Sequence, residues 1–150
     1  MTRRQELTEQ VLAAKRSRGL TWAGLAETLE APVEWSTAAL LGQFPLTAAQ
    51  ARAAVEALGL GEDSVAELTA EPMRGALEGA VPTDPTVYRL YEIVQVYGPA
   101  IKELIHEEFG DGIMSAINFG FTVSREADPS GDRVEIVLNG KFLPYEWRET

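Results

Sequence analysis

The segment VYRLYEIVQVYG, residues 87–98, constrains the fold most, because it predicts a helix with two apolar sides. At about 100° per residue, one stripe holds the residues expected to face a core: Val87, Leu90, Tyr91, Val94 and Tyr97. Ile93 and Val96 lie on the opposite side with Arg89 and Glu92, where a surface helix would be polar throughout. A chain of 150 residues has little left to cover both sides. The pattern therefore indicates that a partner subunit covers the second side.

The first 79 residues predict helices alone, since their apolar residues recur at helical spacing without any alternating strand pattern. Thr21 and Thr47 have the side-chain oxygens that cap helix starts, and Gly19 and Gly59 are typical of helix ends. We therefore expect an all-α bundle in residues 1–79, with helices over these segments: 3–19, 22–30, 33–43, 48–58 and 62–72.

Residues 20–41 resemble the helix-turn-helix unit of repressors, in which a short turn joins two helices. Glu30 and Ala31 stand in the turn, where glycine is the usual residue. The second helix would be the one that reads DNA, yet it has no arginine or lysine and contains Glu34. Acidic side chains also outnumber basic ones in residues 1–79. We therefore expect a scaffold or an oligomerisation unit that binds no nucleic acid.

The composition changes around residues 75–85, where glycines and prolines mark a domain boundary. Asp84 and the proline after it form a strong helix start, with an N-cap acceptor before proline at the first helical position. Gly98 is expected to end this helix. Pro99 is expected to begin another, which ends at Gly110.

Two stretches near the C-terminus alternate apolar and polar residues, as half-exposed strands do. One face of each stretch is apolar: Phe119, Phe121 and Val123 in the first, and Val134, Ile136 and Leu138 in the second. The turn sequence DPSGD between them predicts an antiparallel hairpin, and Asn139-Gly140 predicts a further turn. The fold class is therefore α+β. A helix-turn-helix-like (repressor-like) bundle precedes a small α+β dimerisation unit, residues 80–150, which contains the β-hairpin.

The net charge of −10 and the isoelectric point near 4.6 argue against nucleic acid or an anionic membrane as partner, since both require a basic face. The same charge would repel an anionic substrate unless cations gather locally. The absence of cysteine excludes disulfides and thiol chemistry and is in keeping with a cytoplasmic location. No apolar run is long enough to span a membrane, and the N-terminus lacks the apolar core of a secretory signal.

A metal site is not expected, because His106 is the only histidine of the sequence. The carboxylates around it, Glu107, Glu108 and Asp111, have the pattern of a solvated helix end and not of a ligand set. We expect a structural or surface role for His106.

Arg89 and Glu92 allow two interpretations. Three residues apart on a helix, they can form a surface ion pair, which contributes only about 0–1 kcal/mol. A guanidinium on a covered apolar face would instead make a strong anion site, because it stays charged and presents a planar fork to carboxylate-like oxygens. Composition and spacing leave both interpretations open.

The run VPTDPTVYRLYEIVQVYGPAIKELIHEEFGDGIMSAINF, residues 81–119, resembles the signature block of the cyanase family, also called cyanate hydratase or cyanate lyase. The resemblance continues through the hairpin to GKFLP, residues 140–144, and reaches back more loosely through AALLGQ, residues 38–43. It therefore covers nearly the whole chain. The N-terminal helices and the C-terminal YEWRET depart from the family pattern.

The resemblance implies an enzyme that converts cyanate and bicarbonate to ammonia and carbon dioxide through carbamate, with neither a metal nor an organic cofactor. It implies the catalytic residues Arg89, Glu92 and Ser115, whose types this sequence retains. It also implies a bundle that is similar to a DNA-binding domain without binding DNA. A homodecamer of five dimers, with active sites at subunit interfaces, is the assembly that it implies.

These residue types suit a reaction between two anions. Arg89 would offset their repulsion and align them, while Ser115 would donate a hydrogen bond, since no base lies beside it in sequence. Glu92 would orient Arg89, with proton handling as a weaker possibility. The alternative is a non-catalytic helix-turn-helix transcriptional regulator whose second domain dimerises or binds a small anion.

Overall fold

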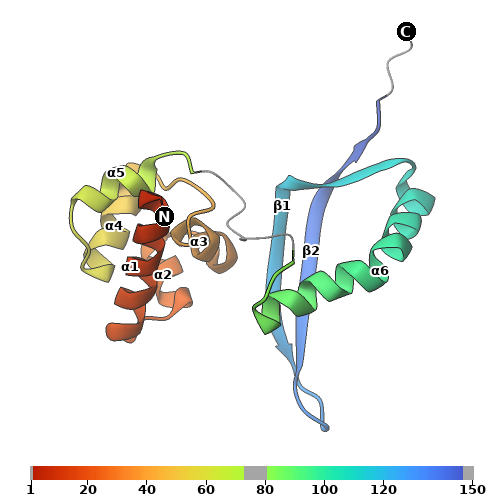
Figure 1. Cartoon of the computed structure of the whole chain (residues 1–150), viewed down its shortest axis with the longest axis horizontal. Coiled ribbons are helices and arrows are strands. Elements are labelled where there is room, and N and C mark those ends of the chain that lie inside the picture. Colours follow the sequence, from red (N-terminus) through yellow and green to blue (C-terminus); the bar gives the residue numbers. More distant parts are fainter. Residues whose placement is uncertain (1, 73–80, 147–150) are drawn as a thin grey trace. The chain divides into compact units, whose positions relative to one another are not determined.

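The computed structural model of the chain describes residues 2–72 and 81–146 (Figure 1). Contacts divide the chain into two compact units, Met1–Ala76 and Leu77–Thr150. The described part of the first unit is helical, and that of the second combines a long helix with a two-stranded antiparallel sheet. This confirms the predicted α+β class. The boundary expected between residues 79 and 80 lies outside the described residues.

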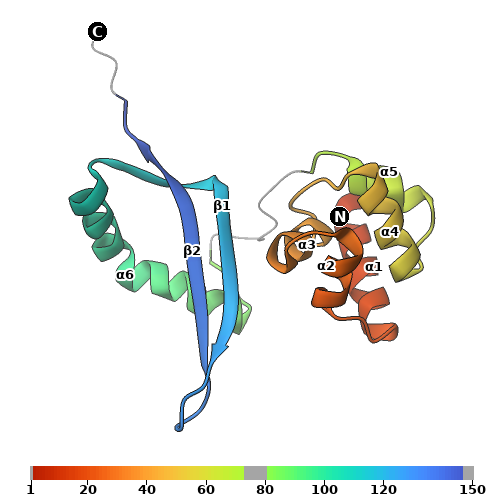
Figure 2. The same ribbon diagram turned by 180° about the vertical axis from the view of Figure 1, so that it is seen from behind.

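The N-terminal unit packs short helices around an apolar core of its own (Figures 1 and 2). The helices are α1 (Arg3–Ser17), α2 (Trp22–Leu29), α3 (Val33–Leu40), α4 (Ala48–Leu58) and α5 (Asp63–Thr69). The largest side chains that they bury completely are apolar, apart from one serine: Leu25, Leu40, Leu58, Leu68, Val11 and Ser36. Burial of a leucine or valine side chain contributes about 1.5–3 kcal/mol, so this unit has the means to hold itself together.

Threonine caps fix where α2 and α4 begin. The Thr21 hydroxyl accepts a hydrogen bond from the Gly24 backbone at 3.0 Å, and Thr47 forms a capping box with Gln50. Gly59 ends α4 in the left-handed conformation. The predicted starts of α2 and α4 are therefore confirmed, each by a cap of about 1 kcal/mol.

The helix-turn-helix unit turns without glycine. Glu30 takes the left-handed conformation itself, at φ 52°, a position that favours glycine or asparagine over glutamate. The turn then leads into α3, whose buried apolar residues are Ala39 and Leu40. Ala38 and Leu41, the other apolar residues at the end of this segment, are only half-buried. At about 100° per residue, they lie nearly opposite the buried side of α3.

The long helix α6 (Pro85–Phe109) begins as predicted, because the Asp84 carboxylate accepts from the backbone N–H groups of Thr86 and Val87. The expected break at Gly98 and Pro99 is wrong, since one continuous helix contains both. Proline has no N–H to donate to the preceding turn, and such an interior site costs about 3 kcal/mol or more. The helix axis bends instead of ending (Figures 1 and 2).

Strands β1 (Gly112–Glu126) and β2 (Arg133–Pro144) form the predicted hairpin. Phe121 pairs with Leu138, and Val123 with Ile136, so the two predicted apolar faces coincide on one side of the sheet. The predicted turn at Asn139-Gly140 is wrong, because both residues lie within β2. Between the strands, the Asp128 carbonyl accepts from the Gly131 backbone at 3.0 Å and confirms the turn at DPSGD.

The C-terminal unit leaves its apolar side chains largely uncovered. No described residue of α6 is buried, and this holds for both of its sides: Val94 is 60% exposed and Val96 is 62% exposed. The stripe expected to face the core is thus covered only in part by its own chain, where Val87 and Tyr91 are half-buried. A two-stranded hairpin is too small to enclose a helix of 25 residues. Within the described segments, no helix is long and apolar enough to cross a membrane.

Candidate active site

Arg89 and Glu92 lie in the second turn of α6, where the Asp84 cap and the following proline fix the helical register. The Arg89 Nη1 and Glu92 Oε2 atoms are 3.7 Å apart. The guanidinium also lies 5.7 Å from the centre of the Tyr88 ring. The structure therefore brings these two predicted residues together as a pair, backed by an aromatic face.

This ion pair is open to solvent in a single chain. The side chains of Arg89 and Glu92 are 67% and 50% exposed. A pair so exposed contributes about 0–1 kcal/mol, and water competes with any anion for the guanidinium. A tight anion site at Arg89 therefore needs a cover that a single chain does not supply.

Ser115 differs from the other two residues, since it is only 5% exposed. Its Oγ accepts a hydrogen bond from the Ile117 backbone N–H at 3.1 Å and another from Asn118 at 2.9 Å. A hydroxyl oxygen has two lone pairs, and these two contacts use both. The Ser115 proton is then left to donate. The arrangement favours a hydrogen-bond donor of fixed direction over a nucleophile.

An irregular β-bulge holds Ser115 in this position. Met114 pairs with Phe142, and the next pair along the sheet joins Phe119 to Gly140. The residues 115–118 thus face only Lys141 on the other strand. Bulges bend a strand and re-aim its side chains, and β1 turns sharply along its length (Figure 1). No pattern in the sequence predicted this bulge.

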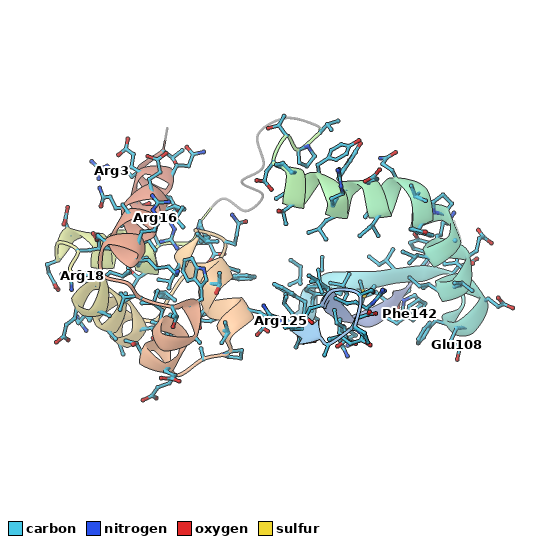
Figure 3. All side chains as sticks on the ribbon, turned by 90° about the horizontal axis from the view of Figure 1, so that it is seen from below. Arg3, Arg16, Arg18, Glu108, Arg125 and Phe142 are labelled. Atoms are coloured by element: carbon cyan, nitrogen blue, oxygen red, sulfur yellow. The ribbon has the colours of Figure 1, made fainter. Side chains whose placement is uncertain are left out.

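His106 ties the end of α6 to the start of β1. Its Nε2 lies 3.1 Å from the carbonyl oxygen of Gly112, and its Nδ1 lies 3.4 Å from the Asp111 carboxylate. The ring meets Tyr145 edge-on at 6.4 Å. One turn further along, Phe109 stacks on Phe142 of β2, with ring centres 5.3 Å apart. Phe142 is labelled on the hairpin in Figure 3, as is Glu108 near the end of α6. These contacts give His106 a structural place at the junction that precedes Ser115.

Direct contacts within one chain join only two of the three predicted residues in the part that the structure describes. No hydrogen bond or ion pair there joins Ser115 to Arg89 or Glu92. At a rise of about 1.5 Å per residue, the helical segment from Arg89 to His106 is about 25 Å long, and Ser115 follows after the junction at the end of α6.

The described residues contain no group of three or more histidine, cysteine, aspartate or glutamate side chains that could hold a metal ion. What the site offers is therefore a guanidinium, its carboxylate partner and an oriented hydroxyl. Such a set can bind and align small anions by charge and hydrogen bonds.

Comparison with known proteins places both halves of the chain in one family. The domain family described as "Cyanate hydratase, N-terminal" matches residues 4–72, and "Cyanate lyase C-terminal domain" matches residues 79–147. The proteins named cyanate hydratase from Mycolicibacterium vanbaalenii and Thiobacillus denitrificans are 58% and 60% identical to the chain. The matches cover 96% and 95% of the chain and 94% and 97% of these relatives.

A solved structure, that of cyanase from T. urticae, is similar in fold with a TM-score of 0.77. It is 37% identical in sequence, and the match covers 94% of this chain and 99% of that one. The regulator considered as an alternative is not favoured by these relatives. The chain belongs to the cyanate lyase family, also named cyanate hydratase.

Proposed function

We propose that the chain catalyses the bicarbonate-dependent breakdown of cyanate to ammonia and carbon dioxide through carbamate. The observation that carries this proposal is the identity of 58–60%, over nearly the full chain, to proteins named cyanate hydratase. In the balanced reaction, an oxygen of bicarbonate bonds to the cyanate carbon, the bond between that oxygen and the bicarbonate carbon breaks, and one proton is taken up. Carbon dioxide and carbamate are formed, and carbamate then takes up a second proton and decomposes to ammonia and a second carbon dioxide.

In this proposal Arg89 holds the two anions together. Two unit negative charges 4 Å apart repel by about 4 kcal/mol at an effective dielectric constant of about 20. A guanidinium offsets this repulsion and keeps its charge at any working pH. Its planar fork also aligns bicarbonate with cyanate, so that proximity supplies much of the acceleration. Several such cations close together would make the local electrostatic potential positive, although the net charge of −10 repels anionic substrates overall.

Ser115 is proposed as the second anion-binding group. Two backbone N–H groups already donate to its Oγ, which leaves its own proton to donate and strengthens it as a donor. Glu92 is proposed to orient Arg89, for which the 3.7 Å separation is the support.

We also propose a homo-oligomer, with Arg89 and Glu92 of one copy completed by Ser115 of another. The uncovered apolar sides of α6 support an interface there, and the lack of a hydrogen bond or ion pair between Ser115 and the pair among the described residues supports a shared site. The family resemblance points to a homodecamer of five dimers. In such an assembly, a neighbouring subunit would cover Arg89, remove water from its guanidinium and so strengthen the anion site.

The proposal includes no metal and no organic cofactor, because charge offset and alignment suffice for a reaction of these two substrates. It includes no nucleic-acid partner, for which the acidic chain and the cation-free α3 are the support. The cysteine-free sequence supports a cytoplasmic location.

The decisive experiment measures ammonia release with cyanate and bicarbonate together and with each omitted in turn. We expect release only when both are present, also after dialysis against a metal chelator. Release without bicarbonate would refute the proposed co-substrate. No release at all, together with salt-dependent retention on DNA, would favour the regulator instead.

A further inference from the structure

Gly140 lies in β2 directly beside the bulge that presents Ser115. The sequence pattern predicted a turn at this residue, yet Gly140 pairs with Phe119 within β2. Glycine weakens a strand interior, because it has no side chain to pack and is more mobile when unfolded. Its presence there needs another reason.

The reason is the close approach of the bulge backbone. A Cβ atom on Gly140 would overlap the carbonyl oxygen of Ser115 and would lie 2.5 Å from Cγ of Met114. The methionine side chain is flexible and can move aside. The Ser115 carbonyl belongs to the backbone, and it can move only if the bulge itself moves.

We infer that Gly140 is a positioning residue for Ser115: its lack of a side chain lets the bulge lie against β2 and so sets the direction in which the Ser115 hydroxyl donates. This inference rests on the proposed function. A Cβ at Gly140 would need the Ser115 backbone to retreat by about 1 Å to reach ordinary contact distance, and a displacement of this size can cost about 100-fold in rate.

Gly120 provides a matched control on the same hairpin. It pairs with Asn139, the neighbour of Gly140, and a Cβ atom there would meet nothing within 4 Å. Both glycines lie in strands, and neither has a positive φ. Gly120→Ala and Gly140→Ala therefore make the same change, from glycine to alanine within a strand. Only Gly140→Ala is expected to displace the bulge.

The test measures ammonia release by the full-length assembled protein and by three variants: Gly140→Ala, Gly120→Ala and Ser115→Ala. We expect Gly140→Ala to lower kcat/KM by about 10–100-fold and Gly120→Ala to change it less than about threefold, since its site is open. Hydrogen exchange, followed by mass spectrometry, should increase in Gly140→Ala at the Ile117 and Asn118 amides and not elsewhere in the hairpin.

A double variant separates positioning from a general structural role. If Gly140 acts through Ser115, Gly140→Ala should cost less than about threefold once Ser115 is alanine, because coupled residues are not additive. Full multiplication of the two effects would overturn the inference. Activity of assembled Gly140→Ala close to that of the parent would overturn it as well.

Two further outcomes are distinguishable from these. If Gly140→Ala does not fold, it is co-expressed with parental subunits; failure to enter mixed assemblies then shows a role in the fold as a whole and overturns the positioning role. An inactive parental protein would refute the proposed function, while an active parent with an unaffected variant refutes only the role of Gly140.

Discussion

Replacement of Ser115 by alanine is expected to do more than remove one hydrogen bond to the substrate. The Oγ atom also accepts from the backbone of Ile117 and of Asn118, at 3.1 and 2.9 Å. Alanine leaves both partly buried N–H groups without an acceptor, at about 1 kcal/mol each. The loss of a preorganised donor alone costs about 10²–10³-fold in kcat. We therefore expect a loss in kcat of about 10³-fold, together with a looser bulge.

Ser115→Thr is the informative comparison, because threonine keeps an Oγ that can accept from both amides and donate its proton. Ammonia release at saturating cyanate and bicarbonate gives kcat for each variant, and light scattering confirms equal assembly. Hydrogen exchange at Ile117 and Asn118 should increase in Ser115→Ala alone. An assembled Ser115→Ala protein that exchanges these amides at the parental rate, or retains more than a tenth of the parental kcat, would refute the bulge-held donor.

Three further substitutions test other groups. Arg89→Lys keeps the charge but loses the planar fork, so the rate of ammonia release by the assembled variant should fall about 10²–10³-fold. A rate close to that of the parent would exclude Arg89 as the anion-binding residue. Glu92→Gln keeps the shape and some hydrogen bonding of an orienting group, so we expect less than about a tenfold loss; near-complete loss would instead indicate a role for its charge or proton. Arg4 donates to the carbonyls of Glu67, Ala39 and Phe44, and burial lowers its pKa below the ordinary value. Arg4→Met should lower the free energy of unfolding of the N-terminal unit by about 2–4 kcal/mol, measured by urea denaturation. Arg16→Met, at an exposed position of the same helix, should change it little. Equal effects of the two substitutions would contradict a stabilising role for the hydrogen bonds of Arg4.

Local signals predicted the N-terminal helices well. Thr21, Thr47 and Gly59 act within one helical turn of themselves, so their chemistry is legible in the sequence without knowledge of the fold. The alternation around Phe121 was equally legible, because a strand's two faces depend only on its own period.

The site was legible only in part. Arg89 and Glu92 belong to one helical turn, and their proximity followed from spacing. The bulge at Ser115 depends on the register in which β1 pairs with β2 on either side of it. No local pattern within β1 determines that register. At Pro99 the local pattern gave a wrong prediction. The free-energy cost of proline inside a helix predicted a break, whereas α6 continues through Pro99 and bends.

The two units differ in what stabilises them against dilution. The N-terminal helices enclose an apolar core within one chain, whereas α6 buries none of its described residues and both strands of the hairpin are sheet edges. Stability that comes from contacts between chains depends on protein concentration by mass action, while stability from an internal core does not. In the proposed homo-oligomer, the folding equilibrium of the C-terminal unit would therefore also be an association equilibrium. A newly made subunit would need to bind its partners before its open strand edges paired with other chains.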